Sequence, residues 1–66
     1  MANSDLVEKW TALKVLVESL EIDLHKSAKG NKSASIRLRK GLRIVKRDAS
    51  DIVKFTLAAE DAEPQT

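Results

Sequence analysis

Cysteine is absent from this 66-residue chain, so no disulfide can stabilise it. Histidine occurs once, at His25, which leaves too few side chains for a structural zinc site. We therefore expect no metal and no cofactor. A chain this short buries a small share of its surface, and domains without such cross-links often depend on self-association.

Long hydrophobic runs are also missing, since the longest are a few residues, such as Val15-Leu16-Val17. A membrane-spanning helix needs about 20 apolar residues, so we expect none. The N-terminal stretch M-A-N-S-D-L-V-E carries acids where a signal peptide has basic residues. We expect a cytoplasmic protein with no role at a membrane, and the lack of cysteine agrees with a reducing compartment.

The residue sets that carry catalysis are missing as well. The sequence has no Ser/His/Asp or Cys/His set and no glycine-rich phosphate loop. Asp48 and Asp51 lie three residues apart, and we interpret them as surface partners of Arg47 or Lys54. A helical chain this small also offers no pocket that could hold a substrate away from water. We predict that the protein is not an enzyme.

Apolar residues in the first part of the chain follow a helical period. They are spaced alternately four and three residues apart, at Leu6, Trp10, Leu13, Val17, Leu20 and Leu24. This heptad pattern predicts an amphipathic helix over about residues 4–28, capped by Asn3 or Ser4. No glycine or proline interrupts it.

A second helix is predicted over about residues 33–59, after a turn at 29–32. Gly30 suits the end of the first helix, and Asn31 or Ser33 can cap the second. The stripe of the second helix is Ala34, Leu38, Leu42, Val45, Ala49 and Ile52. Gly41 within this helix indicates close approach of another helix or, alternatively, of a backbone ligand. Residues 60–66 are acidic and contain the only proline, so we expect a disordered tail.

These elements predict an all-α fold: an antiparallel two-helix hairpin, forming a single domain over residues 1–66. Two helices leave apolar residues exposed, so we expect a homodimer that forms a four-helix bundle. The predicted core and dimer residues are Leu6, Trp10, Leu13, Val17, Leu20, Leu24, Leu38, Leu42, Val45 and Ile52. Four apolar residues outside both stripes suggest a further contact: Val15, Ile22, Ile44 and Phe55.

Charge is strongly segregated along the chain. Residues 26–47 contain nine basic residues and no acid, whereas residues 1–25 and 48–66 each contain five acids. The formal net charge of +2 conceals this pattern. Four of the nine are arginines, whose guanidinium groups bind phosphate well.

The basic block has two interpretations. In the first, it binds a polyanion, and the predicted contacts are Lys29, Lys32, Arg37, Arg39, Lys40, Arg43, Lys46 and Arg47. In the second, it pairs with acids of the first helix, namely Glu18, Glu21 and Asp23, and so steers the antiparallel pairing. We favour binding, because the nine charges exceed the acids available and a two-fold dimer doubles the basic surface.

One segment of the sequence resembles a known family. The stretch K-G-N-K-S-A-S-I-R-L-R-K-G-L, residues 29–42, resembles the hairpin segment of the bacterial linker-histone-like proteins, the chlamydial histone family. The stretch L-K-V-L-V-E-S-L, residues 13–20, also resembles it, and the similarity runs from about residue 6 to 57. The matching positions are Lys29, Gly30, Asn31, Lys32, Ala34, Arg37 and Arg39.

The resemblance implies a nucleoid-associated, DNA-binding protein without enzymatic activity, with Lys29, Lys32, Arg37, Arg39 and Lys40 facing the DNA. Several members continue into a long Lys/Ala/Pro-rich tail, whereas this sequence ends in E-D-A-E-P-Q-T. Because of this difference two alternatives stay open: weaker DNA binding, or a role of the helical part in oligomerisation.

The prediction is therefore non-sequence-specific binding of double-stranded DNA, because no helix carries polar base readers. The alternative is a helical protein-interaction module that docks an acidic partner. RNA is a third option, although few aromatic residues are available to stack on single strands.

Overall fold

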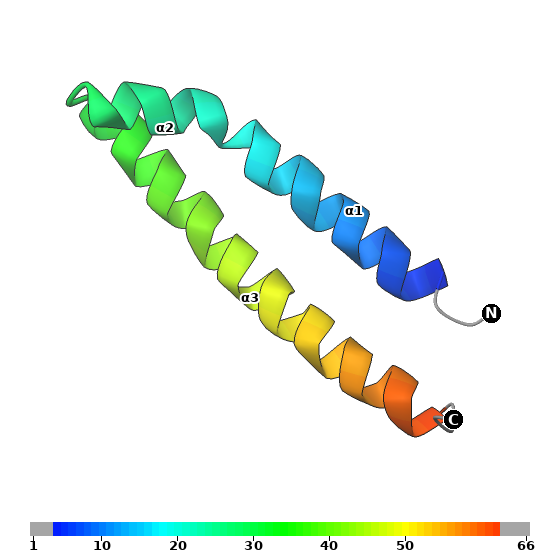
Figure 1. Ribbon diagram of the computed structural model, residues 1–66. Coiled ribbons are helices and arrows are strands. Elements are labelled where there is room, and N and C mark those ends of the chain that lie inside the picture. The colour runs from blue at the N-terminus through cyan, green and yellow to red at the C-terminus, as the bar shows by residue number, and fades with distance from the viewer. Residues whose placement is uncertain (1–3, 63–66) are drawn as a thin grey trace.

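A computed structural model describes residues 4–62, which fold into three helices. They are α1 (Ser4–Ser19), α2 (Glu21–Ala28) and α3 (Lys32–Ala62). The chain doubles back between α2 and α3, so that α1 and α2 form one arm beside α3 (Figure 1). The described part measures 51 × 15 × 15 Å. The all-α, antiparallel arrangement is confirmed, whereas dimerisation stays a prediction.

The tip of the hairpin has a specific backbone structure. Gly30 has a φ of +96°, in the left-handed region, and its N–H donates to the carbonyl of Ser27 at 2.9 Å. The N–H of Asn31 donates to the carbonyl of Lys26 at 3.0 Å, which completes a Schellman motif at the end of α2. Asn31 then caps α3, because its Oδ1 accepts from the N–H of Ala34 at 2.9 Å. Of the two predicted caps, Asn31 is therefore the one used.

The first arm is bent, where the sequence predicted one continuous helix. Leu20 separates α1 from α2, and its N–H donates to the carbonyl of Val17, three residues back, at 3.1 Å. The hydroxyl of Ser19 donates to the carbonyl of Leu16 at 2.6 Å. A three-residue hydrogen bond tightens the turn, and this kind of serine back-bonding commonly bends a helix. The bend has no glycine or proline to mark it in the sequence.

The two arms are in closest contact through small residues of α3. Ala34 is fully buried, Gly41 is also buried, and the side chain of Leu20 lies against Gly41. Near the tip, the hydroxyls of Ser27 and Ser35 form a hydrogen bond of 2.5 Å between α2 and α3. Half-buried apolar side chains extend the contact, namely Leu6, Leu13, Leu16, Leu38, Ile44, Val45, Ile52 and Phe55. Close approach of another helix at Gly41, as the sequence indicated, is confirmed.

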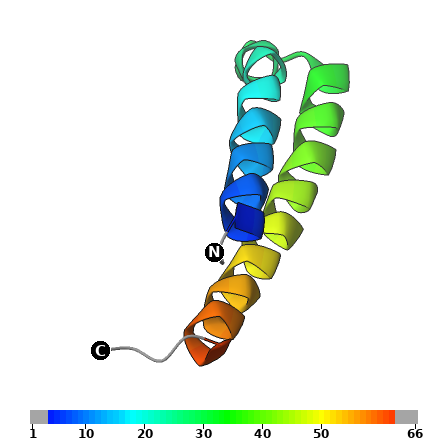
Figure 2. The same cartoon turned by 90° about the vertical axis from the view of Figure 1, so that its right-hand side faces the viewer.

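The end of α3 differs from the sequence prediction. The helix continues to Ala62, beyond the expected end near residue 59, and it extends past the start of α1 (Figure 2). The rest of the predicted tail, residues 63–66, lies outside the described residues. Within residues 4–62, no helix is both long enough and apolar enough to cross a bilayer.

Candidate nucleic-acid interface

All eight basic residues predicted to bind a polyanion are exposed to solvent. Lys29 lies in the turn after α2, and Lys32 is the first residue of α3. The remaining six lie within the first half of α3, at Arg37, Arg39, Lys40, Arg43, Lys46 and Arg47.

Five of these cations share the outer surface of α3, facing away from the other arm. Residues three or four apart are neighbours on a helix, so Arg43 has Arg39, Lys40, Lys46 and Arg47 around it. The residues that face α1 and α2 lie on the opposite side of α3 and are buried or half-buried, as Gly41 is. We call these five residues the basic face. Their arrangement on one side of a rigid helix can contact successive phosphates of a polyanion.

Arg37 is separated from the basic face and contacts the first arm instead. Its Nε and Nη2 both donate to Oδ1 of Asp23 in α2, at 3.1 and 3.0 Å. The carboxylate of Asp23 is mostly covered, at 17% exposure, while the Arg37 side chain is 55% exposed. Arg37 therefore links the two arms near the tip, in the way that the charge-pairing interpretation predicted.

That interpretation accounts for only one cation, however. Among the described residues, the other ion pair joins Arg47 to Asp48 at 3.7 Å and lies within α3. Neither Glu18 nor Glu21 forms an ion pair with the second arm in that part of the chain. Most of the basic block thus remains available to an external partner.

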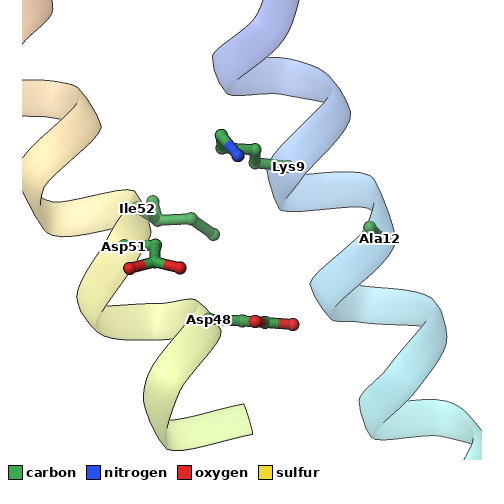
Figure 3. A pocket seen from close by; sticks show the side chains of 5 residues that line it. All are labelled: Lys9, Ala12, Asp48, Asp51 and Ile52. Atoms are coloured by element: carbon green, nitrogen blue, oxygen red, sulfur yellow. The ribbon is translucent and has the colours of Figure 1, made fainter. Parts of the chain in front are cut away.

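Asp48 and Asp51 lie on the edge of α3 opposite to Lys46. Asp48 and Asp51 line a hollow of about 140 Å³ between α1 and α3, together with Lys9, Ala12 and Ile52. Figure 3 shows Lys9, Asp48 and Ile52 directed into the space between the helices. The ammonium of Lys9 also lies 5.1 Å from the centre of the Phe55 ring, a cation–π distance. Residues 4–62 bring together no group of three His, Cys, Asp or Glu side chains that could hold a metal ion.

An apolar groove runs along the other side of the hairpin, between the two arms. It has a volume of about 230 Å³ and is lined by Val17, Leu20, Glu21, Leu24, Leu38 and Leu42. Three predicted core residues on this side are 47–49% exposed, namely Val17, Leu24 and Leu42. Trp10, also predicted as a core or dimer residue, is 55% exposed. Among the described residues Ala34 is the buried hydrophobic one, so the hairpin alone has a thin core.

Basic residues border this groove along α3. Arg39, Arg43 and Lys46 surround Leu42 in a shallow depression, and Leu42 also lines the groove itself. In the sequence pattern, Leu42 belongs to the apolar stripe of the second helix, and the three cations belong to its charged surface. Their contiguity follows only from the way in which α3 is rotated against the first arm.

Comparison with known families decides the classification. The family model described as histone H1-like protein Hc1 matches residues 7–62, which is most of the chain. The protein belongs to this histone H1-like family. It is a non-enzymatic family of DNA-binding proteins, which implies a histone-like role in DNA binding.

The match covers all three helices apart from the first residues of α1. It confirms the resemblance found in the sequence around residues 29–42. The comparisons with curated proteins and with solved structures gave no match.

Proposed function

We propose that this protein is a nucleoid-associated, non-sequence-specific DNA-binding protein that contacts phosphates with its hairpin tip and basic face. The observation that carries the proposal is the position of five cations on one exposed side of α3, in a member of a histone H1-like family. Phosphate contacts supply affinity and orientation without reading bases, which suits a surface made of arginine and lysine.

The tip adds to the same surface. Lys29 and Lys32 flank the turn, and both side chains are exposed. Arg37 is held by Asp23, so its contribution to phosphate binding is smaller than that of Arg43. Lys40 and Arg47 continue the surface away from the tip, and the length of α3 that carries cations spans several phosphates.

Self-association is part of the proposal. Among the described residues the hairpin leaves ten large apolar side chains exposed, and three of them line the groove, namely Val17, Leu24 and Leu42. Covering them in a homodimer would give the chain the apolar core that each hairpin lacks. A dimer would also double the number of phosphate contacts.

The test is a gel-shift titration of a mixed-sequence duplex at several salt concentrations. If each protomer neutralises about four phosphates, log K falls with log salt with a slope of about −4 where one protomer contacts the duplex and about −7 where both do. Lys40→Gln/Arg47→Gln should weaken binding and flatten the slope. The matched control is Lys9→Gln/Lys14→Gln, which removes the same charge from α1. A slope near zero, or equal loss in both variants, would contradict the phosphate-binding surface.

The alternative is a protein-interaction module whose basic face docks an acidic partner. Val15 and Ile22 favour some further contact, because they are 58% and 68% exposed on the outside of the first arm. In that case the native chain, folded by circular dichroism, would produce no shift of duplex DNA at low salt.

A further inference from the structure

We propose that two copies associate through the apolar groove so that each first arm lies on the α3 helix of the other copy. The two hairpin tips then lie at the same end of the dimer, and the two basic faces point in opposite directions. Such a dimer holds two DNA duplexes, one on each side, and therefore bridges DNA. This inference rests on the proposed function and specifies how a dimer holds the DNA.

The two edges of the groove carry opposite charge. Glu21 lines the groove on the side of the first arm, and Glu18 lies three residues before it, in the last turn of α1. On the side of α3, the edge is formed by Arg39, Arg43 and Lys46, around Leu42. The acids Asp48 and Asp51 lie at the hollow on the other side of the hairpin. Lys14, a cation, lies seven residues before Glu21, in α1.

Two hairpins can pack face to face about a two-fold axis in only two ways. If the axis is perpendicular to the helices, α3 lies on α3, which places Arg39, Arg43 and Lys46 of both copies together. If the axis is parallel to the helices, each first arm lies on the other copy's α3, which places acids against cations. Like charges at an interface cost free energy and opposite charges select the register, so the second arrangement is favoured.

The positions of these acids and cations along the length of the hairpin also favour the second arrangement. An axis parallel to the helices keeps every residue at its own height, so heights within one hairpin predict contacts between copies. Leu20 lies against Gly41, which places Glu21 at the height of Arg39 and Arg43. Glu18, one turn away, falls at the height of Arg43 and Lys46. The acids and cations therefore meet without any sliding of the hairpins.

The arrangement determines where the DNA can bind. In a four-helix bundle of this kind the two α3 helices occupy diagonal corners. Lys40 and Arg47, the residues of the basic face that lie outside the groove edge, are on the side of α3 away from the groove, so in the two copies they are directed to opposite flanks of the bundle. One duplex cannot contact both, whereas two duplexes can be held a bundle width apart.

The arrangement of the arms can be measured with spin labels, because the native chain has no cysteine. Glu8→Cys, Val15→Cys and Ile22→Cys place a label at three heights on the exposed outer side of the first arm. With tips together, the distance between the two labels of a dimer should be similar at all three heights. With tips apart, it should change by about 3 Å for every residue from the two-fold axis, twice the helical rise, and that result would overturn the arrangement.

Bridging is measured by immobilising one duplex and asking whether the protein captures a second, fluorescent duplex from solution. The native chain should capture it. Val17→Gln/Leu42→Gln in the groove should abolish capture and keep single-duplex binding with an unchanged salt slope, because each duplex contacts the basic face of one protomer in either case. Val15→Gln/Ile22→Gln, at equally exposed sites outside the groove, is the control and should keep capture.

The outcomes separate the two proposals. Binding of the immobilised duplex without capture of the second would overturn the bridging dimer and leave the proposed function intact. Capture that persists in the groove variant, with that variant monomeric by light scattering, would also overturn it. Failure to bind the first duplex would overturn the proposed function itself.

Discussion

The side chain of Leu20 lies directly on the backbone of Gly41, at the height where the first arm bends. A Cβ atom added to Gly41 would come within 3.0 Å of Cδ1 and 3.2 Å of Cγ of Leu20, and closer still to Cδ2. Because Cγ is involved as well as both methyl groups, a rotation of the leucine side chain alone would not relieve the overlap. The bend of the first arm and the glycine of α3 therefore form one packing unit.

Gly41→Ala should destabilise the protein despite the better helix propensity of alanine. The gain in propensity is about 1 kcal/mol. Overpacking against Leu20 costs about 1–3 kcal/mol, so the net effect should be a loss. Urea unfolding at a fixed chain concentration measures it. In a Leu20→Ala background the same substitution should become neutral or stabilising, and a persistent loss there would contradict the contact.

Gly30→Ala should lower stability for a different reason. Nothing lies within 4 Å of the position that its Cβ would take, but the residue has a φ of +96°. The left-handed conformation costs an alanine about 1–2 kcal/mol, and asparagine should be tolerated better. Thermal unfolding of Gly30→Ala and Gly30→Asn tests the ranking. Equal stability of the two variants would mean that the tip does not need its left-handed residue.

Asp23→Asn should release Arg37 for DNA. The ion pair is partly exposed, so its loss should lower the free energy of unfolding by less than about 1 kcal/mol. DNA affinity should rise, because one arginine is freed and one negative charge is removed. Asp51→Asn is the control, since it removes the same charge at a distance from Arg37. Equal increases in affinity for both variants would show that only net charge matters.

Trp10 provides a direct optical test of self-association. It is the only tryptophan, and 55% of its side chain is exposed in the isolated hairpin. Covering it in a dimer should shift its fluorescence emission to shorter wavelength as the protein concentration rises. Val17→Gln/Leu42→Gln should keep the emission of an exposed tryptophan across the same range. A spectrum independent of concentration, in a chain that light scattering shows to be dimeric, would place the interface away from Trp10.

Much of the fold could be predicted from local sequence. Gly30 and Asn31 mark the turn, because one residue accepts a left-handed backbone and the other caps the next helix. The apolar periodicity identified both arms, and the basic segment around residues 29–42 identified the family that the comparison confirmed. The break at Leu20 could not be predicted, since it depends on packing against α3 and on a serine hydrogen bond rather than on a helix-breaking residue.

The heptad pattern alone could not divide its residues between two surfaces. Leu13 and Leu20 are half-buried against α3, whereas Trp10 and Val17 remain about half exposed. A period of 3.5 residues shows that these side chains share a stripe, which is wider than the contact with a single partner helix. Only the rotation of each helix about its own axis decides which part of the stripe the hairpin uses.

The sequence by itself determined that the chain is helical, that it turns once, and that its cations are concentrated in the turn and the helix after it. These properties follow from the period of the apolar residues, the capping residues and the order of charges along the chain, which are all local features of the sequence. The tertiary structure decided that Arg37 binds Asp23, that the side chain of Leu20 packs on Gly41, and that Glu21 and the cations around Leu42 lie beside the same groove. Those relationships join residues 14 or more positions apart, and they arise only when the two arms pack.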